Sequence, residues 1–452
     1  MPVPLCASVV KILFLPSPPG LSRISQRIGC ARVPAMSLPV LSIVAFAICI
    51  VLSAVTKINV GIVSIAFAFI VGVSFGGMTV REVAGGFPSN LFLILVGVTL
   101  LFSLAATNGT LEKLAHRSVK LARGRVGLIP IIFFALSASL AAIGAGNIAA
   151  TALLAPMAMA VASRLGISAF LMTIVVATGA NAGGLSPIAP TGVIANGLLA
   201  RIDIVGQEAS TFFNNFVAQA VVGLTGYLVF GGYRLLRSRG GASGATEDDD
   251  PVEPLTNSQK LTIGVIAGLV LSVVFFDVNV GMGAFIAAAF LILVRASDEG
   301  AAIKAMPWHA IMMVSGVTVL ISILQQTGGM DLFTSLQARF SNQTTVTGTI
   351  AFITGLISVY SSSSGVVLPA FIPTIPSLIE QLGGGDPIAI AASINVGAHM
   401  VDVSPLSTLG AICIASAPTT ENRTALFNKL LAWGLSMSVV GALVCYVFFG
   451  LL

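Results

Sequence analysis

The chain has 452 residues, of which 56% are hydrophobic and 9% are charged. A soluble domain carries about 25% charged residues, so this composition excludes a soluble globular protein and indicates a polytopic membrane protein. The net charge of +5 does not indicate nucleic-acid binding, because the basic residues lie in short segments between apolar runs and form no basic domain. The five cysteines are scattered and odd in number, so they predict neither a disulfide framework nor a metal site.

Residues 1–35 differ from the rest of the chain, because they contain four basic and no acidic residues and an apolar run too short to span a membrane. Three interpretations remain open: a targeting peptide, a short basic tail, or translation assigned upstream of a true start at Met36. The third is favoured, since Met36 leads directly into the first apolar span. No function is assigned to this segment.

Apolar runs of about 17–25 residues mark the membrane-spanning helices. They occur at 39–56, 60–75, 91–107, 168–200 and 212–233 in the first half, and at 261–276, 280–295, 309–325, 387–418 and 427–451 in the second. Each half also has a longer divided stretch, 127–163 or 345–380, which could form either two spans or a re-entrant hairpin. The runs at 168–200 and 387–418 are each broken by a polar segment that ends in proline.

The two halves correspond residue by residue. For example, Asn59-Val60-Gly61 matches Asn279-Val280-Gly281, and the offset along the chain stays between 217 and 220 residues. This regularity indicates one duplicated unit. The intervening segment has a Gly/Ser run and an acidic run, so we expect a flexible linker outside the membrane. The predicted organisation is an extension at 1–35, a first repeat at 36–235, a linker at 236–259 and a second repeat at 260–452.

The distribution of charge predicts that the repeats are inverted relative to each other. If each divided stretch is a hairpin that does not cross, fifteen basic residues fall on one face and three on the other. Such an excess marks the cytoplasmic side, so the linker is predicted inside and the C-terminus outside. Two full spans in place of each hairpin would destroy this segregation. We therefore predict an all-α polytopic membrane protein of two inverted repeats. Each repeat has about five transmembrane helices, one re-entrant hairpin and a helix broken at the midplane.

Small and polar residues mark both predicted hairpin tips. Gly144-Ala145-Gly146-Asn147 lies in the first half, and Ser361-Ser362-Ser363-Ser364-Gly365 lies at the matching place in the second. A helix that starts inside the membrane presents unpaired N–H groups and the positive end of its dipole, which suit a carboxylate. Alternatively, small residues merely let helices pack closely. The pairing of two tips with two helix breaks favours a binding site.

The helix breaks are the feature most typical of a secondary transporter. Gly183-Gly184-Leu185-Ser186-Pro187 and Val401-Asp402-Val403-Ser404-Pro405 lie 218 residues apart. Irregular backbone at membrane depth occurs only where it is buried in protein or lines a wet cavity, and its carbonyl groups suit Na⁺. A proline kink without functional consequence is the alternative, although a kink would not require the polar run before it.

The two breaks differ at two positions. Asn181 and Gly184 of the first half correspond to His399 and Asp402 of the second. Asp402 is the only acidic residue placed deep in an apolar segment, where charge is costly enough to indicate a function. Because histidine commonly titrates near neutral pH, the pair could bind a proton, ligate a cation or hold a substrate group. The alternatives are a purely structural Asp–His hydrogen bond, or a helix register that places both residues near the membrane interface.

These patterns define two overlapping sets of candidate residues. The substrate-binding set is Gly146, Asn147, Asn181, Ser186, Thr191, Ser363, Ser364, His399 and Ser404. The coupling-ion set is Gly144, Asn147, Gly183, Ser186, Ser361, Asp402 and Ser404. No catalytic residue and no cofactor is expected, apart from a bound Na⁺.

The core from Met36 onward resembles the ion transporter superfamily, which includes divalent anion symporters, citrate carriers and arsenite permeases. Its first half is most similar to the MatC-type dicarboxylate carriers, at residues 86–93, 123–130 and 183–188. The resemblance implies a scaffold domain, a transport domain with an elevator-like motion, and a homodimer. In the divalent anion symporters each tip carries Ser-Asn-Thr and each break carries Thr-Pro. Here only Asn147 and Ser363 match the tips, and Ser-Pro replaces Thr-Pro.

The leading hypothesis is a secondary transporter of a small organic anion such as malonate, driven by Na⁺ or H⁺, in a bacterial inner membrane. An ion antiporter or a metalloid or citrate permease on the same fold is the alternative. A membrane hydrolase could use one of Ser361–Ser364 with His399 and Asp402, but no Gly-x-Ser-x-Gly elbow surrounds these serines. We therefore expect no enzyme. The expected partners are the anion, the coupling cation, lipids and a second copy, without nucleic acid.

Overall fold

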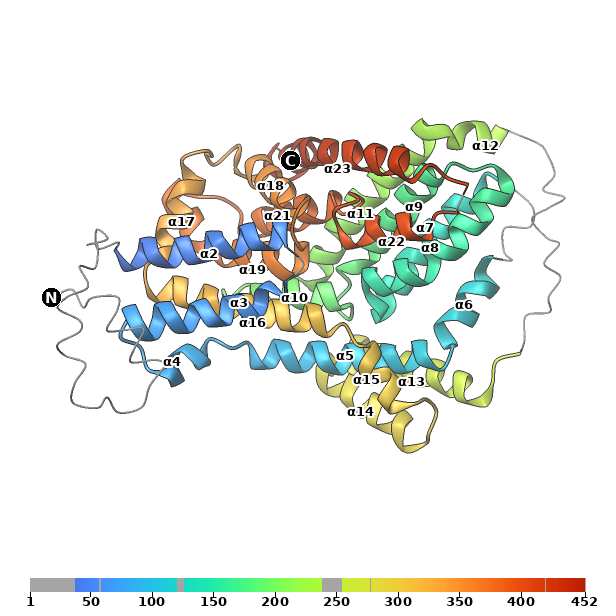
Figure 1. The fold of residues 1–452 in the computed structure, drawn as a ribbon, viewed down its shortest axis with the longest axis horizontal. Coiled ribbons are helices and arrows are strands. Elements are labelled where there is room, and N and C mark those ends of the chain that lie inside the picture. The colour runs from blue at the N-terminus through green and yellow to red at the C-terminus, as the bar shows by residue number, and fades with distance from the viewer. Residues whose placement is uncertain are drawn as a thin grey trace, which may run out of the picture.

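The computed structural model describes residues 37–56, 58–119, 126–237, 254–276, 278–418 and 420–451. The predicted extension at 1–35 and residues 238–253 of the predicted linker lie outside this part of the chain. Throughout the described ranges the chain is helical and forms no strand, which confirms the predicted all-α class. The helices form an elongated bundle, and many of them run along its length (Figure 1).

The helices of the first half follow the predicted apolar runs closely. They are α2 (Leu38–Val55), α3 (Val60–Phe69, continued by a π-helical turn at Ile70–Phe75), α4 (Val80–Gly85), α5 (Ser89–Thr107), α6 (Thr110–Val119), α7 (Leu128–Leu140), α8 (Gly146–Leu165), α9 (Ala169–Gly184), α10 (Pro190–Ala200), α11 (Glu208–Tyr227) and α12 (Tyr233–Arg237). The short α4 was not predicted, because it is not part of an apolar run. It is held by a capping box in which Thr79 and Glu82 bond each other's backbone N–H groups.

The second half repeats the same order of long helices. They are α13 (Asn257–Phe276), α14 (Val280–Leu293), α15 (Glu299–Ala305), α16 (Trp308–Gln326), α17 (Gly329–Ala338), α18 (Val346–Ser358), α19 (Leu368–Phe371), α20 (Ile375–Leu382), α21 (Pro387–Met400), α22 (Thr408–Ser416) and α23 (Arg423–Cys445). A π-helical turn at Ser363–Val367 leads into α19. The short helices α15 and α17 were not predicted.

Within the described residues, six helical stretches are long and apolar enough to cross a membrane, so the chain is an integral membrane protein. They are Ser89–Thr107, Leu128–Leu165, Glu208–Leu236, Trp308–Gln326, Ser363–Leu382 and Arg423–Leu451. The stretch Leu128–Leu165 is not one straight helix, because the backbone at Gly144 leaves helical geometry between α7 and α8. The remaining predicted spans contain shorter apolar stretches, such as Leu38–Ser53 within α2 and Asn257–Val273 within α13.

Corresponding glycines end corresponding helices. Gly109 and Gly328 follow α5 and α16 with φ angles of 75° and 73°, and Gly166 and Gly383 follow α8 and α20 with 66° and 74°. Left-handed backbone of this kind favours glycine, which has no Cβ to clash with the neighbouring carbonyl group. The same local geometry therefore occurs at four positions that the sequence comparison pairs with each other.

The two halves interlock by exchanged contacts. Helix α3 of the first half packs on α16 of the second, and α14 of the second packs on α5 of the first. Two hydrogen bonds repeat this exchange. Asn108 Nδ2 donates to Thr262 Oγ1 at 2.8 Å, and Thr327 Oγ1 donates to Ser42 Oγ, also at 2.8 Å. Because each half buries its helices against the other, the halves form one body.

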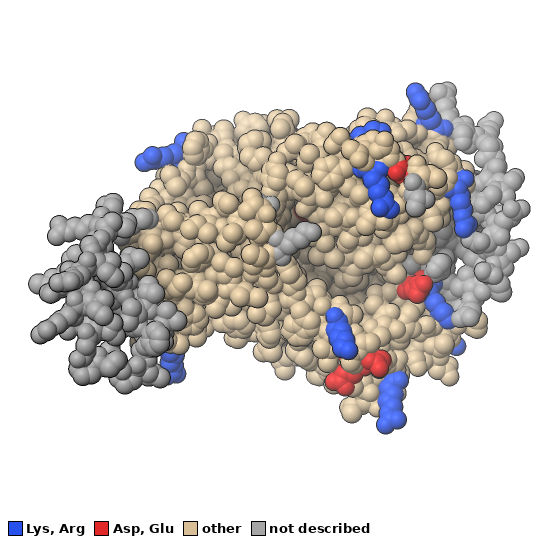
Figure 2. All heavy atoms as spheres, in the orientation of Figure 1, with Lys and Arg blue, Asp and Glu red and all other residues tan. Residues whose placement is uncertain are grey.

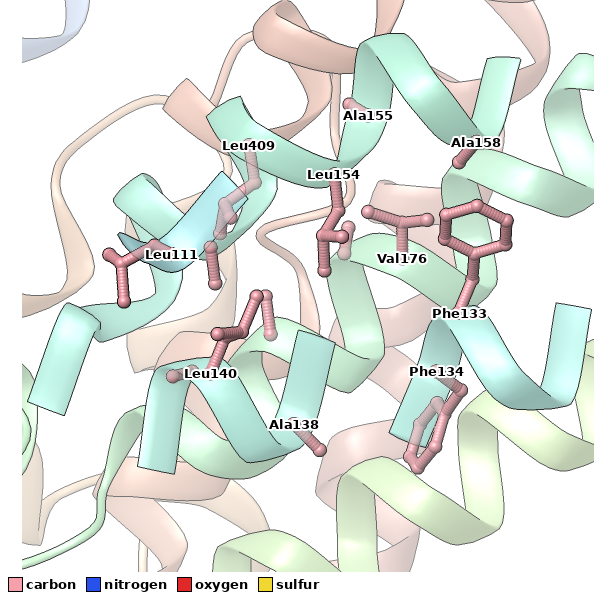
Figure 3. Close-up of a cluster of buried hydrophobic side chains, with 14 of the residues drawn as sticks. Leu111, Phe133, Phe134, Ala138, Leu140, Leu154, Ala155, Ala158, Val176 and Leu409 are labelled. Carbon is pink, nitrogen blue, oxygen red and sulfur yellow. The ribbon is translucent and has the colours of Figure 1, made fainter. Parts of the chain in front are cut away.

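A large apolar cluster also combines both halves. Figure 3 shows Phe133 of α7, Leu154 of α8 and Val176 of α9 converging in one buried group. Leu409 of α22, from the second half, lies in the same cluster and is 2% exposed. The hairpin of the first half therefore packs on the broken helix of its own half and on that of the other half.

Charged side chains are unevenly placed on the surface. In Figure 2 the Lys and Arg side chains gather over the half of the view that carries α6, α12 and α15, and few lie at the opposite end. The surface between them is almost free of charge in this view. The predicted separation of basic residues thus has a counterpart in space. Which end is cytoplasmic stays a prediction.

Candidate functional site

The first hairpin tip is built from two glycines. Gly144 has a φ of 116° and Gly146 has a φ of 80°, so the chain turns between α7 and α8, which pack against each other. A Cβ at Gly144 would lie 2.1 Å from Cε2 of Phe102, so the site tolerates no side chain there. Asn147 follows in the first turn of α8 and is 8% exposed. The tip therefore presents one buried amide side chain.

The second hairpin tip presents a hydroxyl group. The chain leaves α18 at Ser358 and becomes helical again at Ser363. The Ser362 hydroxyl accepts a hydrogen bond of 3.0 Å from the N–H of Gly365 and so caps this turn. Ser363 is buried, and its Oγ lies 2.6 Å from the Oγ of Ser358.

The two helix breaks have closely similar backbone packing. Helix α9 ends at Gly184 and α10 starts at Pro190, while α21 ends at Met400 and α22 starts at Thr408. The following helix returns tightly over each break. A Cβ at Gly192 would lie 2.0 Å from the Ser186 carbonyl oxygen, and one at Gly410 would lie 2.1 Å from the Ser404 carbonyl oxygen.

Each tip reaches the break of its own half. Asn147 Nδ2 donates to Asn181 Oδ1 at 2.8 Å, and Ser363 Oγ donates to Asp402 Oδ1 at 2.6 Å. The two half-sites are joined across the centre. Asn181 Nδ2 donates to the His399 carbonyl oxygen at 2.9 Å and lies 3.5 Å from Asp402 Oδ2. A single buried network therefore connects both tips and both breaks.

Asp402 is the focus of this network. It is 5% exposed, and it is the only buried acidic side chain among the described residues. Its carboxylate accepts from one hydroxyl and, over a long distance, from one amide, whereas an ionised carboxylate offers about four acceptor sites. The Ser407 hydroxyl donates to the backbone carbonyl oxygen of Asp402 and so holds the backbone of the break in place. The carboxylate thus keeps acceptor capacity for a proton or a cation.

His399 is buried beside Asp402 but does not bond it. Its Nδ1 lies 2.8 Å from the Asn395 carbonyl oxygen and can only donate there, and its Nε2 has no partner. The structural Asp–His hydrogen bond, the alternative to a functional pair, is not formed. The hydrogen bonds of a Ser-His-Asp triad are also not formed, because Ser363 bonds Asp402 directly. The sequence Gly72-Val73-Ser74-Phe75-Gly76 does have the Gly-x-Ser-x-Gly form, but it lies in the π-helical turn after α3.

Several predicted residues lie outside the hydrogen-bonded network. Ser361 Oγ lies 2.9 Å from Ser53 Oγ of α2, and Ser404 Oγ accepts from the N–H of Leu406 at 3.3 Å. Gly183 serves close packing, since a Cβ there would lie 2.0 Å from the Ala138 carbonyl oxygen. Ser186 and Thr191 are buried near the first break, and Ser364 is half-buried at the second tip.

Two contributors were missed by the sequence analysis. Asn215 of α11 is fully buried, and its Nδ2 donates to the Asn181 carbonyl oxygen at 2.8 Å. Ser358 of α18 contacts Ser363 at the second tip. Asn215 gave a usable signal, because it is an amide within an apolar span and Gln219 follows four residues later. Ser358 gave none, since single serines are common in such helices.

A separate polar cavity lies between α10 and α16. Its volume is about 210 Å³, and it is lined by Leu198, Arg201, Ile202, Thr318, Ile321, Ser322, Gln325 and Pro373. Arg201 is exposed, whereas Thr318 is 2% exposed, so the cavity extends from the surface inward. Arg201 directly follows α10, the helix after the first break, so the wall of this cavity contains a cationic side chain.

The comparisons with known proteins agree with this architecture. Residues 36–184 match the family model for the N-terminus of the dicarboxylate carrier protein MatC. The uncharacterised transporters Mb2703 of Mycobacterium bovis and Rv2684 of Mycobacterium tuberculosis are each 23% identical over 320 residues, which is 66% of this chain and 70% of theirs. The predicted resemblance of the first half to MatC-type carriers is thus confirmed.

Two solved structures have a similar fold. The YdaH transporter of Alcanivorax borkumensis, reported to have an unusual topology, gives a TM-score of 0.54 at 16% identity and covers 92% of this chain and 98% of its own. MtrF of Neisseria gonorrhoeae, reported to illuminate a class of antimetabolite efflux pumps, gives 0.55 at 14% identity and covers 95% and 97%. The chain therefore has the fold of membrane transporters, with a first half similar to dicarboxylate carriers.

Proposed function

We propose that this protein is a secondary active transporter of a small organic anion, coupled to Na⁺ or H⁺. The observation that carries the proposal is the buried network in which both hairpin tips reach both helix breaks around Asp402. Paired broken helices that meet inside a membrane protein are typical of substrate and ion sites in secondary transporters. The match to dicarboxylate carriers supports a dicarboxylate such as malonate.

The isolation of Asp402 supports coupling between an anion and a cation. Among the described residues its side chain bonds only a hydroxyl and an amide, and no Lys or Arg neutralises it. A carboxylate substrate placed beside an ionised Asp402 would be repelled, because like charges interact strongly where water is scarce. A cation or a proton on Asp402 removes this repulsion, so each ligand favours binding of the other.

The hairpin tips supply the donors that an anion needs. Helix α8 begins at the first tip, so its first N–H groups and the positive end of its dipole lie beside the Asn147 amide. The Ser363 hydroxyl is the corresponding donor at the second tip. We infer that the substrate carboxylates bind between these two tips while the cation binds at Asp402 and the carbonyl groups of the breaks.

The cavity beside Arg201 supports an anionic substrate. A single guanidinium group at its mouth, with Thr318, Ser322 and Gln325 along its wall, would attract and partly desolvate a carboxylate. We infer that the substrate approaches through this cavity from the predicted outer face. The proposal also includes inverted repeats with the predicted domain limits, a cytoplasmic linker, a homodimer and a location in a bacterial inner membrane.

Transport by the purified protein in proteoliposomes tests the function. Labelled malonate, succinate, citrate and malate are supplied in turn under an imposed Na⁺ gradient, an imposed pH gradient, or neither. We expect one dicarboxylate to accumulate only when a cation gradient is present. Cation flux that needs no anion would favour the antiporter alternative. Hydrolysis without transport would favour the membrane hydrolase, and a protein that moves none of these ions would overturn the proposal.

A further inference from the structure

Helices α11 and α21 pack against each other, and each carries buried polar side chains; we call the line of contact between the two helices the α11–α21 seam. At the surface it opens in a small groove between the starts of the two helices, lined by Leu199, Ile204, Gln207, Thr211, Asn214, Ile388, Ala391 and Ala392. The two helices pack against each other, and Ala218 and Val222 of α11 share an apolar cluster with Val396 and Met400 of α21. The helices therefore remain in contact from the groove inward.

Polar residues recur at intervals of four on both helices. On α11 they are Thr211, Asn215 and Gln219, and on α21 Asn395 and His399 follow the groove residue Ala391. Residues four apart lie on the same face of a helix, so each set forms one stripe. Asn215 and Gln219 are 0% exposed, Asn395 is 1% exposed and His399 is 2% exposed. Each stripe starts at the groove and continues into the interior.

These four residues leave an unusual number of buried polar atoms without a partner. The unpaired atoms are Asn215 Oδ1, Gln219 Nε2 and Oε1, Asn395 Nδ2 and Oδ1, and His399 Nε2. They make up six of the thirteen such atoms in the described part of the chain. Buried polar atoms are nearly always hydrogen-bonded, and a polar space that the protein does not fill itself normally holds ordered water. Because these six unpaired atoms belong to the two stripes and are not scattered through the protein, we expect them to share one set of water molecules.

Each stripe has one contact with the central network, through Asn215 on α11 and His399 on α21. Asn215 donates through Nδ2 to the Asn181 carbonyl oxygen at 2.8 Å, and Asn181 donates to the His399 carbonyl oxygen at 2.9 Å. The same Asn181 side chain lies 3.5 Å from Asp402 Oδ2. From Thr211 to Gln219 the seam is about 12 Å long at 1.5 Å per residue. A few water molecules would therefore be enough to join the groove to the neighbourhood of Asp402.

We propose that the α11–α21 seam holds a file of water that connects the surface groove with the Asp402 network. The six unpaired atoms bind this water, and the file gives the coupling cation a hydrated route to the carboxylate, separate from the hairpin tips. Naming a coupling cation as the species that travels rests on the proposed function, whereas the hydration does not. The competing arrangement is a dry seam in which Gln219 and Asn395 rotate to bond each other.

Cysteine accessibility in proteoliposomes tests the proposal. Single cysteines are placed at Thr211, Asn215, Gln219 and Asn395, and a small water-soluble methanethiosulfonate reagent is added. The matched controls are A218C and V222C, which are buried on the same helix, and V217C. The native Val217 side chain is apolar and 53% exposed. Modification is measured on the individual peptides by mass spectrometry, so the native cysteines need not be removed.

We expect all four seam positions to react at least tenfold faster than the three controls, with rates that fall from Thr211 inward. If Q219C and N395C both react as slowly as A218C while T211C reacts readily, the seam is dry and the proposal is wrong. Gel filtration before labelling verifies that each variant is folded; if only one of the two deep variants folds, its labelling rate alone decides.

The labelling needs no substrate, so its outcome is separate from that of the transport assay. A protein that transports a dicarboxylate but has an unreactive seam keeps the proposed function and loses the hydrated route. A protein with a reactive seam and no transport keeps the hydrated seam and loses the proposed function. As a second readout, Gln219→Leu should lower the rate of cation-driven uptake at saturating substrate about tenfold and leave the substrate KM unchanged. Uptake that is unchanged in Gln219→Leu and Asn395→Leu would remove the route from the transport cycle.

Discussion

Asp402 differs from the other described acidic residues in being buried near the middle of the molecule with two neutral partners. The Ser363 hydroxyl at 2.6 Å and the Asn181 amide at 3.5 Å orient the carboxylate without neutralising it. A buried charge without an opposite charge is unfavourable, so such a residue persists where a ligand supplies the missing charge during function. In the predicted correspondence between the halves, Asp402 takes the place of Gly184, so the two half-sites differ in charge.

Replacement of Asp402 by Asn should abolish accumulation of substrate against a gradient. The amide keeps the size and can still accept from Ser363, but it cannot bind a cation or a proton. Exchange of internal for external substrate should persist, because exchange does not require the empty, cation-free carrier to return. The measurement compares gradient-driven uptake with substrate exchange, and Asp331→Asn on the exposed surface of α17 is the control. Normal ion-dependent accumulation in Asp402→Asn would make the carboxylate structural and leave the ion at backbone carbonyl groups.

Removal of either tip donor should weaken substrate binding and leave membrane insertion intact. Hydrogen bonds to a charged group contribute about 1.5–3 kcal/mol, so Asn147→Ala and Ser363→Ala should each raise the substrate KM roughly 10- to 150-fold. The control is Ser436→Ala on α23, an exposed serine whose hydroxyl donates to the Trp433 carbonyl oxygen. If Asn147→Ala and the Ser363/Ser364 double alanine variant both have the uptake kinetics of the wild type, the substrate site does not lie at the tips.

At the scale of single residues, sequence reasoning was informative where a residue type was unusual for its surroundings. An acid, a histidine and two asparagines in apolar helices indicated the half-sites, and the structure brings Asn147, Asn181, Ser363 and Asp402 into one network. The bond between the halves could not be predicted, because it depends on how two segments 218 residues apart pack together. Asn215 was overlooked although its surroundings carried the same signal.

The helical elements follow from apolar run length, while their meeting points depend on glycine. Helices α10 and α22 each return over the preceding break at a glycine, Gly192 or Gly410, whose Cα lies against a carbonyl oxygen. These glycines have ordinary helical geometry, so space, rather than backbone conformation, explains them. Periodicity in the sequence predicted the long helices well. It could not predict α4 and α15, because short helices in connections depend on caps such as Thr79 and Asp298. Helix α17, also not predicted, starts after Gly328 without a side-chain cap.

Alanine at Gly192 or Gly410 should destabilise the protein and reduce transport. A Cβ would lie 2.0 Å or 2.1 Å from a backbone carbonyl oxygen, so the helix must move away from the break. Gly264 and Gly268 of α13 are the controls, because an added Cβ would meet nothing within 4 Å there. Alanine in the controls should stabilise the helix by about 0.5–1 kcal/mol. Samples are heated in detergent, and size-exclusion chromatography measures the folded protein that remains at each temperature. The Tm values then rank the variants by stability. A Gly410→Ala variant as stable as Gly268→Ala would contradict this packing account.

On the scale of the whole molecule, the two halves are interdependent. The exchanged pair of hydrogen bonds, Asn108 to Thr262 and Thr327 to Ser42, ties the first helices of each half to the other half. The apolar cluster in Figure 3 likewise combines α7, α8 and α9 with α22. The duplication predicted the matching elements, but sequence similarity between the halves does not indicate whether they form separate domains or interlock. That distinction arises from burial, because neither half covers its own apolar faces.

The direction of insertion follows from charge at the same scale. The basic side chains gather towards the end of the molecule that carries α6, α12 and α15, whereas α4 and α17 at the other end carry only Arg81 and Arg339 in or next to their helices (Figures 1 and 2). Loops rich in Lys and Arg stay in the cytoplasm during insertion. Reporter fusions should therefore place residue 250, within the acidic linker, in the cytoplasm and Leu452 outside. If each half crosses the membrane five times, the second half is reversed, so fusions that put both points on one side would rule out inverted repeats. In that case the divided stretches cross the membrane fully, and the two tips cannot approach the centre from opposite sides.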